Sequence, residues 1–375
     1  MALSIGGAVM WSLWPPPLKS LAEEIKARAN AVQVGLVAVG AAGAAFTLWL
    51  AVRRQSTTEE DSRQQRMTEL YTAAVEQLGH DSAAVRLGAL YALQRLGQTY
   101  PEQRRAIVNV WCAYLRMPFR DPDADGLEEE EREKRRQELE VRLTVQRLLR
   151  EHAHSGPHNG KPASPRFWGD ELDVDLTGAT LHQLDLSGCR IHPNTTFTEA
   201  TFTGETSFLE ATFTGETSFL EATFTGETSF LEATFTDRVL FNKATFTSHV
   251  LFYKTTFTSH AWFYKTTFTS QTSFNSASFT NGASFTEASF TGDAAFHSAS
   301  FTGDAQFEGV VASCAGEHVW PVGWELVPAD DVDVPEGGDP DATWGRLVQL
   351  NGAASGEAPG EPDEDVEGPR RPDVP

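Results

Sequence analysis

The sequence predicts a mainly β chain, in which a four-sided β-coil follows a membrane-spanning helix and a small helical module. Three observations predict this architecture. Phenylalanine recurs at alternating steps of five and six residues from Phe197 to Phe307. Residues 31–52 form a long run without a charged side chain. Between these two regions, from about residue 57 to 152, apolar residues recur at the three- and four-residue steps of helices.

The phenylalanine series carries the β prediction. An α-helix cannot keep this register, because about 3.6 residues per turn would scatter the rings around its circumference. A flat sheet alternates with a period of two and would need long excursions between rings. A square coil fits, since each side of about five residues places one large apolar side chain inside. A small or β-branched residue stands two positions before each ring, as at Ala200, Thr206 and Val239, and we expect it to point inward too.

The steps also set the length of a coil. Steps of five and six, taken twice, give 22 residues per coil, with one bulged residue on every second side. Phe197 to Phe307 then forms five coils, and a leucine series from Leu176 to Ile191 adds about one more. We expect the coil to occupy residues 171–310. Residues 153–170 are then a linker and cap, and residues 311–328 are a C-terminal cap.

Three successive pentads, residues 174–178, 179–183 and 184–188, each carry Val, Ala or Leu first and Leu third. This pattern resembles the pentapeptide-repeat family, whose consensus is a small residue, a polar residue, Leu or Phe, and two polar residues. The resemblance implies a right-handed quadrilateral β-helix. The charge-free run and the helical module, including residues 70–79 and 85–93, resemble the N-terminal region of actinobacterial membrane-associated members of that family.

The charge-free run predicts a membrane anchor. At about 1.5 Å per residue, residues 31–52 reach about 33 Å, enough to cross a hydrocarbon core of about 30 Å. Trp49 near the end and Arg53 and Arg54 after it are typical of a membrane interface. Such a run exceeds a signal peptide, so we expect a single-pass protein that contacts membrane lipid through residues 31–52. Basic residues are slightly more numerous after the run than before it, which favours a cytoplasmic C-terminal repeat domain at the cell membrane. The preceding residues, 1–30, form an N-terminal segment.

The helical module, residues 57–152, is predicted to contain four helices. Gly79 is expected to end the first helix, with Asp81 capping the second and Gly97 closing it. Pro101 suits the first turn of a third. The fourth runs from about residue 127 to 150, with glutamates at its start and arginines at its end. Short paired helices of this kind resemble a HEAT-like hairpin array.

Composition limits the possible functions. The formal net charge is −22, which argues against binding nucleic acid through its phosphates. The three cysteines are widely separated and predict neither a disulfide framework nor a metal site. We find no enzymatic motif and expect no catalytic, cofactor-binding or metal-binding residues. His152, His154 and His158 fall in a Gly/Pro-rich linker, and the acidic tail of residues 329–375 is expected to be disordered.

Because the inward residues fill the core, we expect function to depend on side chains that point outward from the coil. Glutamates recur at half-coil intervals early in the coil, as at Glu205, Glu216 and Glu227, and an aromatic and basic band follows between residues 238 and 265. Large apolar groups on a surface often mark contacts, although drift within a tolerant repeat would also produce them. Threonine ladders on two faces leave ice binding as a remote alternative. The candidate partner surface consists of Leu240, Leu251, Tyr253, Trp262 and Tyr264.

These observations favour a membrane-anchored, non-enzymatic scaffold or protein–protein interaction module with an unknown protein partner. The family resemblance adds an alternative, because some pentapeptide-repeat proteins mimic DNA and bind type II topoisomerases through an acidic rod. The glutamate rows fit that alternative, whereas the basic band interrupts them.

Overall fold

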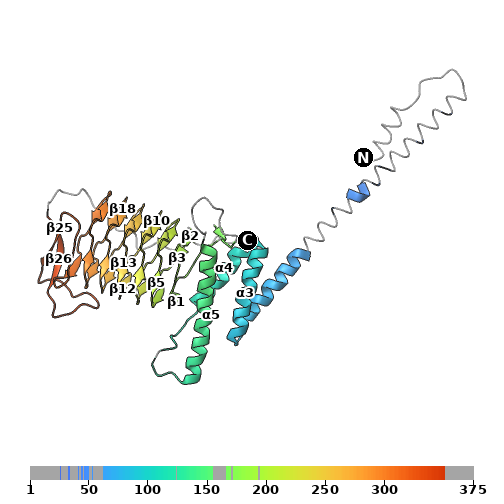
Figure 1. The fold of residues 1–375 in the computed structure, drawn as a ribbon, viewed down its shortest axis with the longest axis horizontal. Coiled ribbons are helices and arrows are strands. Elements are labelled where there is room, and N and C mark those ends of the chain that lie inside the picture. The colour runs from blue at the N-terminus through green and yellow to red at the C-terminus, as the bar shows by residue number, and fades with distance from the viewer. Residues whose placement is uncertain are drawn as a thin grey trace, which may run out of the picture. The chain divides into compact units, whose positions relative to one another are not determined.

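The computed structural model describes residues 62–123, 125–154, 166–169, 172–192 and 195–350, together with isolated positions between 26 and 53 (Figure 1). The chain divides into two units, residues 1–80 and 81–375, and each is treated by itself. In the first unit, residues 62–78 form a helix. The anticipated membrane span, residues 31–52, lies outside the described residues apart from a few isolated positions. Within the described ranges, no helix is long and apolar enough to cross a membrane.

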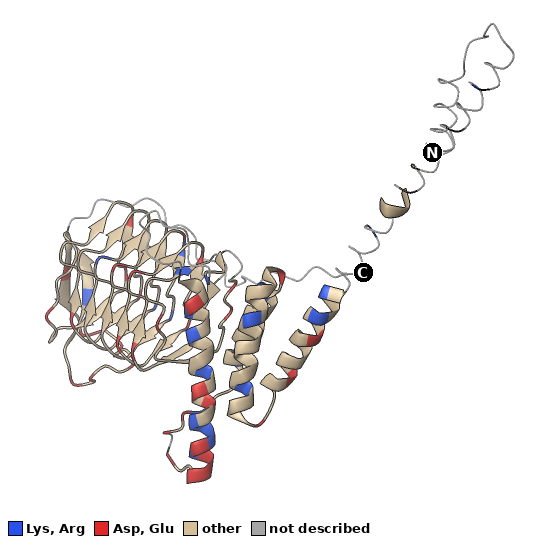
Figure 2. Ribbon diagram, turned by 45° about the vertical axis from the view of Figure 1, so that its right-hand side comes forward, with Lys and Arg blue, Asp and Glu red and all other residues tan. Residues whose placement is uncertain are grey.

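The second unit begins with three α-helices that pack on one another. They are α3 (Ala83–Thr99), α4 (Arg104–Arg116) and α5 (Glu129–Ala153), with the 3-10 helix η1 (Pro101–Gln103) between the first two. Leu93, Trp111 and Val145 are fully buried between them. The start of α5 is acidic and its last turn is basic, which suits the helix dipole (Figure 2). These helices do not form a free-standing array, because α4 and α5 also contact the first strand of the coil.

Two expected helix boundaries were wrong. Ser82, rather than Asp81, is the N-cap of α3, and its side chain makes no capping hydrogen bond. Gly97 does not end α3, which continues to Thr99 with Gly97 buried inside it. A side chain at this position would collide with Trp168, since an added Cβ would lie 2.7 Å from the indole Cη2 atom. Gly97 therefore makes room for an indole rather than terminating the helix.

Residues 166–169 lie against the helical module through this indole. The His152 imidazole stacks on the Trp168 ring at a centroid distance of 3.7 Å, and Trp111 stacks on the same ring at 5.5 Å. The backbone N–H of Trp168 donates to the carbonyl of His152 at 3.1 Å. This segment, expected to be part of a linker and cap, thus contributes Trp168 to the core of the helical module.

The β-coil follows, and each turn of it contributes one short strand to each of four walls (Figure 1). Wall I contains β1 (Thr180–His182), β4 (Thr201–Thr203), β8 (Thr223–Phe224), β12 (Thr245–Phe246), β16 (Thr267–Phe268), β20 (Ser289–Phe290), β24 (Val311–Ser313), β26 (Trp344–Gln349) and β25 (Trp324–Pro328). Wall II contains β5 (Thr206–Ser207), β9 (Thr228–Ser229), β13 (Val250–Leu251), β17 (Thr272–Ser273) and β21 (Ala294–Ala295). Wall III contains β2 (Arg190–Ile191), β6 (Thr212–Phe213), β10 (Thr234–Phe235), β14 (Thr256–Phe257), β18 (Ser278–Phe279) and β22 (Ser300–Phe301). Wall IV contains β3 (Thr195–Thr196), β7 (Thr217–Ser218), β11 (Val239–Leu240), β15 (Ala261–Trp262), β19 (Ala283–Ser284) and β23 (Ala305–Gln306).

The register confirms the coil length that the phenylalanine steps predict. Neighbouring strands of the coil are parallel, and they pair Thr234 with Thr256 and Phe235 with Phe257. This offset equals two five-residue steps plus two six-residue steps. We number the coils from their wall I strands, so that β4 to β7 form coil 2 and β12 to β15 form coil 4. Walls II and IV are opposite each other, since the chain visits the four walls in turn.

The residue added at each six-residue step lies in a corner, rather than as a bulge within a side. Five-residue steps turn through a tight corner, in which Ala211 N–H donates to the Phe208 carbonyl at 3.0 Å and Glu210 adopts a φ of 55°. The same left-handed conformation recurs at every half coil, up to Ser298. Six-residue steps turn through a wider corner, such as residues 214–216. Tight and wide corners therefore alternate around the coil.

The interior is filled by stacked phenylalanine rings, as the sequence predicted. Rings one coil apart lie nearly parallel, for example Phe202 and Phe224 at a centroid distance of 4.3 Å. Rings on the opposite walls II and IV meet edge to face, as Phe230 and Phe241 do at 5.5 Å. Every ring of the series is buried except Phe301, which lies in the last strand of wall III and has no coil beyond it. The expected small inward residues, among them Ala200 and Thr206, are also buried, except Ala299 and Ala305 in the last coil.

Both ends of the coil are covered. At the first end, the Gln146 side chain of α5 accepts a hydrogen bond from His182 N–H at 3.1 Å and donates one to its carbonyl at 2.7 Å. At the other end β26 continues wall I in the antiparallel direction, and the Trp324 ring packs on Phe307. The C-terminal cap is therefore longer than residues 311–328. The expectation of disorder from residue 329 was wrong as far as residue 350, and residues 351–375 lie outside the described part.

Candidate protein-interaction surface

The five residues expected to form one partner surface lie on two opposite walls. Leu240 and Trp262 are neighbours in wall IV, where their Cα positions are register partners, and Tyr264 follows Trp262 at the next corner. Leu251 lies in wall II, and Tyr253 follows it. Half a coil separates Leu240 from Leu251, and the same interval separates Tyr253 from Tyr264. In the sequence, these five residues form one group because they lie close together along the chain.

On wall IV, an apolar centre is bordered by basic residues, and we call this set the wall IV patch. The His260 imidazole stacks on the Trp262 indole at a centroid distance of 5.6 Å. The Lys265 ammonium lies 4.8 Å from the Tyr264 ring centroid, and the Tyr264 hydroxyl lies 3.5 Å from a Glu287 carboxylate oxygen. The patch consists of Leu220, Arg238, Leu240, Lys243, His260, Trp262, Tyr264 and Lys265.

The basic residues of the patch pair with glutamates one coil away. Lys243 pairs with Glu221 at 3.1 Å, Lys265 pairs with Glu287 at 3.5 Å, and Arg238 pairs with Glu216. All of these side chains are about half exposed, so each pair contributes little to stability. The acidic rows and the basic band, which looked separate in the sequence, are therefore stacked in the same columns.

Wall II carries a different surface, which we call the wall II acidic surface. In coils 2 and 3 its outward positions are Glu205, Leu209, Glu210, Glu227, Leu231 and Glu232. Lys254 of coil 4 pairs with Glu232 at 3.0 Å, and this carboxylate raises the pKa of the Lys254 ammonium. Glu205, Glu210 and Glu227 have no ion pair within the described ranges.

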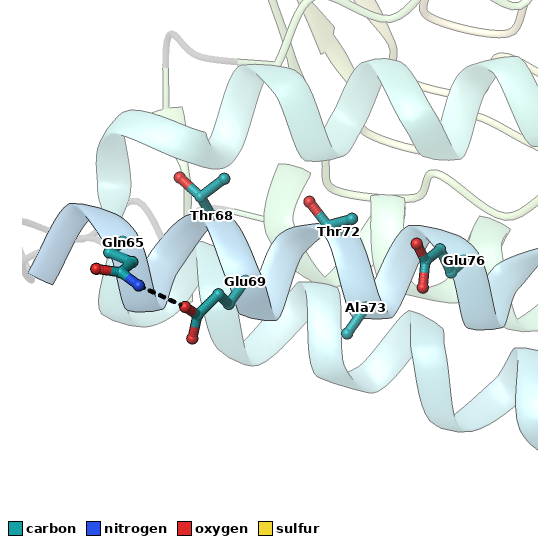
Figure 3. Close-up of a pocket in the computed structure, with 6 residues that line it drawn as sticks. All are labelled: Gln65, Thr68, Glu69, Thr72, Ala73 and Glu76. Atoms are coloured by element: carbon teal, nitrogen blue, oxygen red, sulfur yellow. Dashed lines mark hydrogen bonds between the residues drawn. The ribbon is translucent and has the colours of Figure 1, made fainter. Parts of the chain in front are cut away.

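Among the described residues, the other features of the surface do not assemble into a catalytic constellation. A shallow hollow on the helix of residues 62–78 is lined by Gln65, Thr68, Glu69, Thr72, Ala73 and Glu76 (Figure 3). A side-chain hydrogen bond in this hollow joins Gln65 Nε2 to Glu69 Oε1 at 2.9 Å. In the part of the chain that the structure describes, no group of three or more His, Cys, Asp and Glu side chains is arranged to hold a metal ion.

Burial shifts the pKa values of several His and Cys side chains. Burial lowers the pKa of His152, whose Nδ1 donates to the carbonyl of Arg166 at 2.6 Å. Burial also lowers the pKa of His182. It raises the pKa of both Cys112 and Cys189 to about 12. A thiol with so high a pKa is a poor nucleophile, because the thiolate is the reactive form.

A comparison with protein families agrees with the geometry of the coil. Residues 186–234, 208–256 and 230–278 each match the family model described as pentapeptide repeats (9 copies). No curated protein and no solved structure matches the chain. The coil is thus a β-solenoid, and its central coils, within residues 186–278, match the pentapeptide-repeat family model.

Proposed function

We propose that the chain is a non-enzymatic scaffold that binds another protein through the wall IV patch. The coil offers no internal site for a small ligand, since phenylalanine rings fill it. Binding then takes place on the outer walls. Trp, Tyr and Arg, which the patch combines, are the residues most enriched at the energetic centres of protein interfaces.

The observation that carries this proposal is that the fold does not need the aromatic residues of the patch. The column that holds Leu240 and Trp262 carries Ser218 one coil before Leu240 and Ser284 one coil after Trp262. The residue one coil after Tyr264 is Thr286. Small polar residues therefore satisfy the same backbone positions, and the large apolar groups have a role other than packing.

An affinity-capture experiment tests this proposal. The purified chain and a variant with Trp262→Ser and Tyr264→Thr are used to capture proteins from a lysate of the native cells, followed by quantitative mass spectrometry. We expect at least one protein to be enriched with the wild-type chain and lost with the variant. The matched control is Leu251→Ser with Tyr253→Asn on wall II, which copies Ser273 and Asn275 of the next coil. Equal capture by all three proteins would contradict the proposal.

We further propose that residues 31–52 anchor the scaffold in the cell membrane, with the repeat domain on the cytoplasmic side. This part of the proposal is supported by the sequence alone. The full chain and a chain that begins at residue 57 are expressed in the same cells and separated by alkaline extraction and flotation. We expect only the full chain to stay with the membrane fraction, and recovery of both in the soluble fraction would refute the anchor.

The DNA-mimic alternative has no observation of its own in the structure. Basic residues interrupt the glutamate columns and pair with them, as Lys243 does with Glu221. A supercoiling assay with a purified type II topoisomerase tests the alternative, which predicts inhibition by the chain.

A further inference from the structure

We infer that the chain associates with further copies of itself, with the wall IV patch of one copy lying against the wall II acidic surface of the next. This inference rests on the proposed function, because it takes the wall IV patch to be a protein-binding surface, and it names the partner. The two surfaces lie on opposite sides of one rod, and their charges are of opposite sign.

The charge columns of the two walls match over successive coils. In coils 3 and 4, wall IV presents the cations Arg238, Lys243 and Lys265 around its apolar centre. In coils 2 and 3, wall II presents four glutamates around Leu209 and Leu231: Glu205, Glu210, Glu227 and Glu232. A second copy placed side by side and shifted by one coil brings these cations opposite these glutamates. The shift is about 4.8 Å, the spacing of neighbouring strands.

The match continues beyond these two coils. With the same shift, Glu287 in coil 5 of wall IV faces coil 4 of wall II, which carries His249 and Lys254. Apolar residues lie in the same row, because Trp262 and Tyr264 of coil 4 face coil 3 of wall II, which carries Leu231. Cations in the patch already pair with glutamates of their own chain, but these exposed pairs are weak and can exchange partners.

Symmetric pairing centred on the cations of wall IV, or on the glutamates of wall II, is disfavoured by the same charges. If two wall IV patches met around a twofold axis between coils 3 and 4, Lys243 and Arg238 of one copy would face Lys265 and His260 of the other. Two wall II surfaces would likewise bring glutamates together. Like charges placed opposite each other in an interface oppose association. In these two placements like charges meet, whereas wall IV against wall II brings opposite charges together.

The consequence is a row rather than a closed pair. A contact between two different surfaces leaves one unused surface on each copy, and such contacts form rings if the rotation closes and open assemblies if it does not. Walls II and IV face opposite directions, so successive copies add by sideways translation. The row can then grow without closing.

The test uses two variants that each lose one surface. The wall IV variant carries Trp262→Ser and Tyr264→Thr, which copy Ser284 and Thr286 of coil 5. The wall II variant copies coil 5 in the same way, since Gln271 and Asn275 occupy there the positions of the glutamates and leucines that are replaced. Its substitutions are Glu205→Gln, Leu209→Asn, Glu227→Gln and Leu231→Asn. Circular dichroism first verifies that both full-length variants are folded. Their masses, and that of the wild-type chain, are then measured in a detergent solution that accommodates the proposed anchor, by sedimentation velocity up to about 100 μM, which detects contacts far weaker than about 1 μM.

We expect the wild-type mass to increase with concentration beyond that of a dimer, and each variant alone to remain a monomer. An equimolar mixture of the variants is expected to form a one-to-one complex and nothing larger, because each variant supplies the surface that the other lacks. Raising the salt concentration from about 0.1 M to about 1 M, which shortens the screening length from about 10 Å to about 3 Å, is expected to weaken all of these complexes.

Three results would overturn the inference: a wild-type chain that stays monomeric, a variant that still self-associates, or a mixture that fails to form the one-to-one complex. If the wild-type chain is monomeric but still captures a different protein through Trp262, self-association is refuted and the proposed function is retained. Loss of both self-association and Trp262-dependent capture would remove both.

Discussion

Single residues join the helical module to the segment that leads into the coil, and Gly97 is the clearest case. It lies within α3, and the Trp168 indole fills the space that a side chain at this position would need. The indole is in turn held between His152 and Trp111. Glycine is required at position 97 because the Trp168 indole approaches the helix backbone closely. It does not end the helix, which is a common role of glycine.

The substitution Gly97→Ala should displace Trp168 and destabilise the protein. Overpacking a tight site costs about 1–3 kcal/mol in the free energy of unfolding. Chemical denaturation followed by tryptophan fluorescence measures this loss. The control is Gly88→Ala in the same helix, where an added Cβ meets nothing within 4 Å. That variant should gain about 0.5–1 kcal/mol from better helix propensity. Equal effects of the two substitutions would show that Trp168 does not occupy this space.

The cysteines give a second prediction at this scale. Cys112 and Cys189 are buried, with pKa values raised to about 12, whereas Cys314 is partly exposed. At mildly alkaline pH we expect a thiol reagent to modify Cys314 readily in the folded protein and to modify all three cysteines after denaturation. Mass spectrometry of the labelled chain counts the modified thiols. Rapid native labelling of Cys189 would show that α5 does not cover the first coil as described.

Among the elements, α5 works as the cap of the coil. Its Gln146 side chain offers β1 the donor and acceptor that another strand would have offered. Salt bridges support the same contact, since Arg150 of α5 pairs with Asp185 at 2.8 Å and Arg116 of α4 pairs with Asp175. Solenoid repeats need such terminal caps, because an uncovered coil leaves its backbone groups and core exposed.

Replacing Gln146 with Met keeps most of its volume and removes both hydrogen bonds. The N–H and carbonyl of His182, a buried residue, would then lose their partner, which costs about 1–3 kcal/mol for each unsatisfied group. Equilibrium denaturation of Gln146→Met measures the loss. Gln137→Met, on an exposed turn of the same helix, is the matched control and should change stability by less than about 0.5 kcal/mol. A similar small change for Gln146→Met would rule out its role as a strand substitute.

Comparison of elements shows what the sequence could and could not predict. The coil was predictable, because the phenylalanine steps are a strictly local signal. The ion-pair columns and the division of the candidate residues between two walls were also readable, had residues been compared at intervals of one coil and half a coil. The socket at Gly97 was not, since Trp168 lies far along the chain and no periodicity connects the two residues. The hairpin formed by β25 and β26 was missed because its acidic, Gly- and Pro-rich connection resembles a disordered tail.

For the whole molecule, the length of one coil determines which deletions the fold tolerates. Deleting residues 212–233 removes one whole coil and lets Thr234 take the place of Thr212, its register partner. We expect this chain to fold cooperatively with a modestly lower melting temperature. Deleting residues 214–233 removes four pentads but shifts the later coils by two positions, which takes the phenylalanine rings out of register. Thermal unfolding followed by circular dichroism should show a much larger loss, and equal melting temperatures would contradict the coil length described here.

The sequence Thr-Phe-Thr-Gly-Glu-Thr-Ser-Phe-Leu-Glu-Ala occurs three times without change at residues 201–211, 212–222 and 223–233. Each copy covers half a turn, so this stretch has a twofold screw axis along the rod. A molecule approaching it meets the same chemistry from either flank and cannot distinguish one from the other. The symmetry ends at Asp237, where the units begin to differ. Orientation is thus encoded in the few positions that depart from the repeat.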